Sequence, residues 1–212
     1  MDDIIMKGNS REDRPICAAL YRSTMDYFPP SIIGYFVISD DWSEQTLLAL
    51  KEKSGADFLV GIQTGNNEFQ HLFENLDIIK GVIKCQPNEV EDIINLLDVY
   101  SPRYVISLNV YDIKGLFESS NSFKFVQTIA TGSSESDLLE TAMQQLVSQL
   151  SSVGDIKGLF VNPESSESLT LKDFAYISEA IESVYDGTEV YYSQSITNEL
   201  NSFCVRAIYA EG

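Results

Sequence analysis

Short runs of apolar residues alternate with amphipathic segments along most of this 212-residue chain. Continuous apolar runs such as 32–39 and 57–63 are typical of strands that are covered on both faces. Segments such as 134–150 instead place apolar residues three and four positions apart, as one face of a helix does. The alternation predicts an α/β fold, in which helices pack on a sheet of mostly buried strands.

Local signals mark where several elements begin and end. Ser43 is a predicted N-cap, and Gly55 a predicted end, for a helix over 43–55. Asn88 is a predicted N-cap as well. Two consecutive prolines at 29 and 30 would stop a helix over 17–28. The other expected helices are 68–76, 88–100, 134–150 and 169–185. The expected strands are 32–39, 57–63, 80–85, 123–131, 156–162, 188–195 and 203–210, and 103–117 is expected to be a strand leading into a loop.

The charge balance excludes some classes of partner. The chain has 32 acidic and 14 basic side chains, a net charge of −18. Nucleic acids and anionic membrane surfaces are held by clustered Lys and Arg, so neither is an expected partner. No run approaches the ~18 apolar residues that a membrane span needs. We therefore expect neither nucleic-acid binding nor membrane insertion.

The cysteines and the N-terminus indicate a compartment. Cys17, Cys85 and Cys204 lie far apart, and no two of them form a C-x-x-C pair. Buried free thiols are the expected role, rather than redox or metal chemistry. The first 15 residues do not have the basic and apolar pattern of a signal peptide. These features predict a cytoplasmic protein.

Several pieces of the C-terminal half follow one another in a recognisable order. Residues 188–212 contain two strands, an Asn-Glu-Leu-Asn connector, Arg206 and a final Ala-Glu-Gly. Upstream, 158–174 contains a strand ending in Val-Asn, a loop and a Leu-Thr-Leu entry into a helix. Before that, 131–150 contains a Gly-bearing turn and an Ala-containing helix. In order and spacing these pieces resemble the C-terminal domain of the FtsZ/tubulin family, and the resemblance covers about 103–212.

One loop of this domain carries chemistry in the family. FtsZ proteins enter the domain through a loop of the form Asn-x-Asp-Phe-x-Asp, whose carboxylates position a cation and the attacking water at the nucleotide of the next subunit. The matching stretch here is Ser-Leu-Asn-Val-Tyr-Asp at 107–112. Only Asp112 retains a carboxylate, while Asn109 and Ser107 stand at the other two positions. The resemblance implies that Ser107, Asn109 and Asp112 form a partner interface. The alternative is that Asp112 is simply the N-cap of a helix.

The glycine-rich phosphate loop of the family is missing. Such a loop cradles phosphates with backbone N–H groups, yet the 12 glycines here are scattered and no Gly-Gly pair occurs. The single histidine, His71, has no companion at metal-ligand spacing, and no G-x-S-x-G elbow is present. We therefore expect no enzymatic activity, no catalytic residues, no metal and no cofactor.

The first half of the chain has two interpretations. Residues 1–102 are too few for a complete nucleotide domain of this family. They are either a truncated remnant of such a domain or a second, shortened copy of the C-terminal unit. The expected division is therefore into an α/β N-terminal half, 1–102, and an FtsZ-like C-terminal domain, 103–212.

The resemblance implies a binding role more directly than a reaction. The favoured hypothesis is a non-enzymatic FtsZ-like protein that acts through protein–protein contacts and modulates or joins a cytoskeletal or cell-division filament. Its partner would be FtsZ or a second copy of itself. The alternatives are an unrelated adaptor and a small-ligand-binding α/β domain.

Overall fold

The computed structural model describes residues 16–65, 76–132, 135–185, 187 and 189–212. His71 lies outside the described residues, and so does all of the expected helix at 68–76 except its last residue. Within them, strands and helices alternate and build one continuous ten-stranded sheet. The expectation of an α/β fold is confirmed. No helix in these described ranges is both long enough and apolar enough to cross a membrane.

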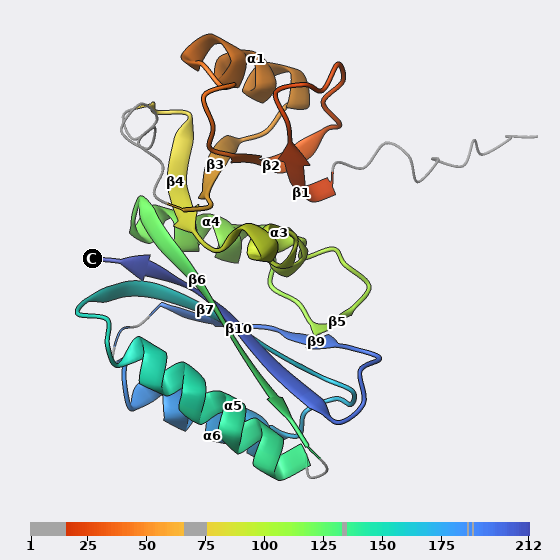
Figure 1. Ribbon diagram of the computed structural model, residues 1–212, viewed down its shortest axis with the longest axis vertical. Helices are drawn as coiled ribbons and strands as arrows, with labels where there is room; N and C mark the ends of the chain where they lie inside the picture. The colour runs from red at the N-terminus through yellow and green to blue at the C-terminus, as the bar shows by residue number, and fades with distance from the viewer. Residues whose placement is uncertain (1–15, 66–75, 133–134, 186, 188) are drawn as a thin grey trace, which may run out of the picture.

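The N-terminal half contributes four short parallel strands, shown at the top of Figure 1. These strands lie side by side in the order in which they occur along the chain, with all neighbours parallel. They are almost fully buried, because helices cover both faces of this part of the sheet. Their bounds are β1 (Ile16–Tyr21), β2 (Ser31–Val37), β3 (Phe58–Gln63) and β4 (Ile79–Lys84).

The C-terminal half contains three ten-residue strands and three short ones. The central strand β10 (Ser202–Glu211) is antiparallel to both β6 (Ser122–Thr131) and β7 (Ile156–Ser165). The short strands β8 (Val190–Tyr192) and β9 (Gln194–Ile196) both pair with β7. The last strand of the sheet, β5 (Tyr104–Ile106), pairs with β9.

The two half-sheets enclose a middle layer of two helices (Figure 1). This layer contains α3 (Val90–Leu97), preceded by a 3-10 turn at Pro87–Glu89, and α4 (Val110–Ser119). Their apolar side chains share one core cluster with residues from both halves of the sheet. The outer faces are covered separately, by α1 (Glu44–Ser54) on the N-terminal half and by α5 (Glu135–Leu150) and α6 (Leu171–Glu182) on the C-terminal half.

The helix termini confirm part of the sequence analysis. Ser43 caps α1, and Gly55 ends it in the left-handed conformation with a φ of 66°. The cap predicted at Asn88 is wrong, because Asn88 lies inside the 3-10 turn and α3 begins two residues later.

Three other segments differ from expectation. The helix predicted over 17–28 is instead strand β1, which ends at Tyr21 and pairs with β2 in parallel. The segment 103–117 was predicted to be a strand leading into a loop; the strand is β5, and most of the predicted loop belongs to helix α4. The single strand predicted over 188–195 is divided into β8 and β9.

Candidate functional site

The three residues singled out by the family resemblance lie together between β5 and α4. Ser107 is exposed directly after the last residue of β5. Asn109 is the N-cap of α4, and its Oδ1 accepts hydrogen bonds from the backbone N–H groups of Tyr111 at 2.8 Å and Asp112 at 3.1 Å. In return, Asp112 Oδ2 accepts a hydrogen bond from the backbone N–H of Asn109 at 2.8 Å. The two side chains therefore form a reciprocal capping box.

This geometry refines the capping alternative. The N-cap is Asn109 rather than Asp112, and Asp112 occupies the third helical position of the same box. A carboxylate in the first turn is also favoured by the helix dipole. Both side chains therefore have a structural role that holds the turn between β5 and α4 in one conformation.

Exposed apolar side chains gather around this turn. Four of the ten large apolar side chains exposed in the described structure lie within the twelve residues 100–111: Tyr100, Val105, Ile106 and Tyr111. Tyr111 is the most exposed of the four, with 77% of its surface accessible. We refer to residues 100–111 as the edge segment, since it contains the terminal strand of the sheet.

The edge segment is also low in charge. It contains one arginine and no acidic residue, although the chain as a whole has 32 acidic residues. Large exposed apolar clusters mark interaction sites more often than isolated apolar side chains do. The segment therefore combines the two properties, low charge and exposed apolar area, that are typical of the centre of a protein interface.

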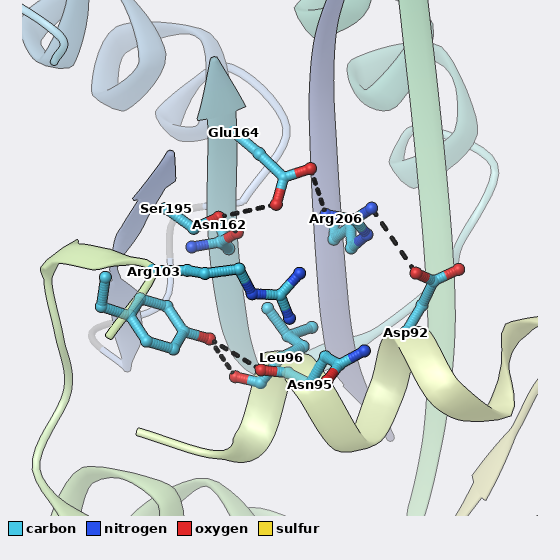
Figure 2. Close-up of a pocket in the computed structure, with 9 residues that line it drawn as sticks. Asp92, Asn95, Leu96, Arg103, Asn162, Glu164, Ser195 and Arg206 are labelled. Carbon is cyan, nitrogen blue, oxygen red and sulfur yellow. Dashed lines mark hydrogen bonds and ion pairs between the residues drawn. The ribbon is translucent and has the colours of Figure 1, made fainter. Parts of the chain in front are cut away.

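A polar cleft lies behind the edge segment, between α3 and the inner face of the C-terminal half-sheet (Figure 2). Arg206 of β10 is its central group. Its Nη1 lies 3.0 Å from Glu164 Oε1 and its Nη2 lies 3.5 Å from Asp92 Oδ1, while Nε donates to Gln127 Oε1 at 2.7 Å. The guanidinium thus connects α3 to three strands of the sheet.

The rest of the cleft is closed by further hydrogen bonds. The Ser195 hydroxyl lies 2.9 Å from Asn162 Oδ1 and 3.1 Å from Glu164 Oε2. The Tyr104 hydroxyl donates to the Leu96 carbonyl at the end of α3. Burial raises the pKa of that hydroxyl, so it stays protonated and remains a donor. The remaining cavity has a volume of about 20 Å³, which is room for one water molecule. We refer to the contacts of Arg206 with Asp92, Gln127 and Glu164 as the Arg206 clamp, because they join α3 of the middle layer to the C-terminal half-sheet.

The thiols are poorly suited to chemistry at neutral pH. Burial raises the pKa of Cys17 to about 11, and those of Cys85 and Cys204 to about 12. A thiol is nucleophilic and binds metals as the thiolate. No group of three or more His, Cys, Asp or Glu side chains in the described part of the chain is arranged to hold a metal ion.

Most of the chain matches solved structures of known proteins. The empty FtsZ dimer of M. jannaschii superposes with a TM-score of 0.59 at 14% identity, covering 85% of this chain and 62% of that chain. This chain has an FtsZ/tubulin-like fold. The GTPγS-bound protofilament of CetZ2 from Haloferax volcanii also matches with a TM-score of 0.59, at 11% identity, covering 85% of this chain and 65% of that chain. The GDP-form protofilaments of TubZ from Bacillus thuringiensis serovar israelensis match with a TM-score of 0.55 at 9% identity, covering 84% and 61%.

These matches define the fold and its extent. No protein-family model and no curated protein matches the chain. At 9–14% identity the likeness is one of fold, and this chain spans about three fifths of the length of the solved structures. Coverage of 85% exceeds residues 103–212 and so extends into the N-terminal half, which the sequence resemblance did not include. The fold is one in which CetZ2 and TubZ form protofilaments.

The sequence resemblance singled out residues 107–112, but the exposed apolar side chains near them in sequence were not predicted. The exposed positions of Val105, Ile106 and Tyr111 depend on the sheet ending at β5, which local patterns do not reveal. The acid-free run at 100–111 can be read directly from the sequence, but 119–134 and 141–154 are acid-free as well, so the run alone does not single out this surface. The Arg206 clamp requires residues 92, 127, 164 and 206 to meet, which only the tertiary structure shows.

Proposed function

We propose that this protein acts by associating with another subunit of the FtsZ/tubulin-like fold, either a second copy or an FtsZ, and does not hydrolyse nucleotide. The observation that carries the proposal is the edge segment, which contains Ser107, Asn109 and four exposed apolar side chains, has no acidic residue from 100 to 111, and directly precedes Asp112. Such a protein would join or modulate a cytoskeletal filament.

Electrostatics supports the same surface. Two copies of a chain with a net charge of −18 repel each other over most orientations. The repulsion is weaker where a contact carries few acidic residues, as it would along 100–111, and burial of Tyr111, Val105 and Ile106 there adds favourable apolar contact. Association should therefore strengthen with salt, which screens the repulsion between the other surfaces.

The absence of hydrolysis is supported by the sequence and the cap. No Gly-Gly pair is available for a phosphate loop. Asp112, the one carboxylate retained in the family's loop, accepts the N-cap hydrogen bond of α4. Positioning a cation and a water for phosphoryl transfer needs carboxylates that are free to bind them.

We further propose that residues 1–102 correspond to a shortened nucleotide domain. All four strands of this half are parallel, whereas β10 in the C-terminal half is antiparallel to both of its neighbours. A duplicated C-terminal unit would be expected to repeat the antiparallel pairs, so the parallel pattern favours the remnant.

Sedimentation velocity tests the proposed contact. Replacing Tyr111 with Ser should weaken self-association, or association with purified FtsZ, by about tenfold, since exposed aromatic side chains are frequent hot spots. The matched control is Leu171→Ser, which removes an apolar side chain that is 90% exposed on α6. Equal effects of the two variants would contradict the proposal. Calorimetric titration with GTP should show no binding, and tight binding would contradict the non-enzymatic role.

A second pair of variants separates the cap from the contact. Asp112→Ala removes the acceptor for the Asn109 backbone N–H and should weaken association by loosening the turn. Asp112→Asn retains an acceptor oxygen and should restore association. If the charge of the Asp112 carboxylate were needed instead, the two variants would weaken association equally.

A further inference from the structure

The edge segment contains a strand, β5, whose outer edge is open. In the described structure β5 is the terminal strand of the sheet and pairs only with β9, so its outer edge has no strand beside it. Natural edge strands are usually protected by charged side chains, because unpaired backbone groups accept a further strand. Here the two residues that end β5, Val105 and Ile106, are apolar and exposed.

We propose that β5 pairs with β5 of a second copy in an antiparallel, two-fold symmetric dimer that extends the sheet across both subunits. This inference rests on the proposed function, because it names the partner and the geometry of the same surface. It differs from a head-to-tail contact, in which two different faces meet and assembly continues. A two-fold contact uses the same face twice and closes after two subunits.

The distribution of apolar side chains favours a second copy of this face as the occupant. The edge segment holds four of the ten exposed large apolar side chains in the described structure. The next concentration is the pair Met25 and Tyr27, and the remaining four are separated in sequence. Of the described surfaces, the same segment of another copy therefore presents the most apolar area to match it.

The charge pattern agrees with this pairing. Antiparallel pairing centred on Val105 places Val105 opposite its own copy, Tyr104 opposite Ile106, and Arg103 opposite Ser107. No like charges face each other in this register, because Arg103 is the one charged residue of the edge segment. Ser107 offers a hydroxyl oxygen to the opposing guanidinium. Contacts between acid-rich parts of the surface would instead bring acidic residues of two chains together.

A symmetric disulfide tests the geometry directly. Residues directly opposite in an antiparallel pair have Cα atoms about 4.5–5.5 Å apart, which a disulfide can span. Val105→Cys should therefore form a 105–105 cross-link on mild oxidation. Both cysteine variants carry Cys85→Ser as well, because Cys85 is half-buried and could form cross-links of its own. Cys17 and Cys204 are buried and can stay. The matched control is Leu171→Cys in the same background, which is more exposed and should cross-link far less.

The solution mass completes the test. The wild type should sediment at twice 23.7 kDa without larger species, and Ile106→Lys should return it to the monomer mass with unchanged secondary structure. Larger species that grow with concentration would overturn the two-fold dimer, as would equal cross-linking of both cysteine variants. A monomeric wild type that still binds FtsZ through Tyr111 would overturn the dimer and leave the proposed function standing. A wild type that neither self-associates nor binds FtsZ would overturn both the dimer and the proposed function.

Discussion

The two half-sheets differ from each other, and both differ from the junction between them. In the C-terminal half, β10 pairs with β6 at nine positions and with β7 at eight. In the N-terminal half, each parallel pair joins five positions. At the junction, β4 and β6 pair at only three positions, from Val82 to Lys84 on β4. The backbone therefore holds each half more extensively than it joins the two halves.

Side-chain contacts add to the three backbone pairs between β4 and β6, on a buried side and on an exposed side of the junction. On the buried side, Arg206 joins the C-terminal half to Asp92 of α3, and β4 packs closely against Phe123. On the exposed side, Lys84 of β4 contacts Glu211 at 2.7 Å. Buried polar contacts are costly to break, whereas exposed ion pairs contribute little. The junction should thus depend on its buried side, and three substitutions test this in order of expected effect.

The largest effect is expected at Arg206. Arg206→Ala would leave Glu164, only 12% exposed, without its cation. Breaking a buried ion pair typically costs about 3–5 kcal/mol of unfolding free energy. Urea denaturation should show a loss of this size.

The matched control is Arg103→Ala, which removes the other guanidinium at the cleft (Figure 2). Arg103 is exposed and takes part in none of the ion pairs among the described residues. A loss at Arg206 no greater than at Arg103 would show that the ion pairs of Arg206 do not stabilise the fold. The double variant Arg206→Met with Glu164→Gln should recover much of the stability, because the least exposed carboxylate of the cleft is then neutral and Asp92, which is 33% exposed, can be solvated.

A smaller effect is expected at Gly81 of β4. A Cβ atom there would lie 2.5 Å from the Phe123 ring, which is fully buried at the start of β6. The ring cannot move away without disturbing the shared core of the two halves, so Gly81→Ala should destabilise by about 1–3 kcal/mol. Gly154→Ala is the control, since nothing lies within 4 Å of its Cβ position. Equal midpoints of thermal unfolding for the two variants would refute the close approach.

The sequence allowed prediction of elements whose signals are local. Ser43 and Gly55 mark the ends of α1 because an N-cap hydroxyl and a left-handed glycine act within one turn. The ten-residue strands of the C-terminal half were predicted because each carries a recognisable strand pattern, which in β6 is an alternation of apolar and polar residues.

Errors arose where tertiary structure decides. The run Cys-Ala-Ala-Leu-Tyr at 17–21 suits a helix or a buried strand equally, and only the neighbouring β2 makes it a strand. Helix α4 is a local exception, because its start is set by the capping box of Asn109 with Asp112, and the sequence analysis named a helix here only as the alternative in which Asp112 is the N-cap. The loop of the candidate site could be predicted by resemblance, whereas its apolar surroundings depend on where the sheet ends.

The smallest effect is expected at the exposed side of the junction. Glu211 is partly buried, which by itself would raise its pKa, but hydrogen bonds from Lys84 and Ser122 lower it below the ordinary value. A carboxylate with a lowered pKa in the folded state stabilises above its unfolded pKa, and the stabilisation is lost as the pH falls through the folded value. Lys84→Met should therefore cost less than about 1 kcal/mol at pH 7. This difference from wild type should shrink as the pH falls through the lowered pKa of Glu211. The control is Lys157→Met, because Lys157 and Asp155 are both more than half exposed. Chemical denaturation at pH 7 and pH 3 measures both, and a cost for Lys84→Met that is as large at pH 3 as at pH 7 would mean that packing of the lysine stem, rather than its charge, stabilises the junction.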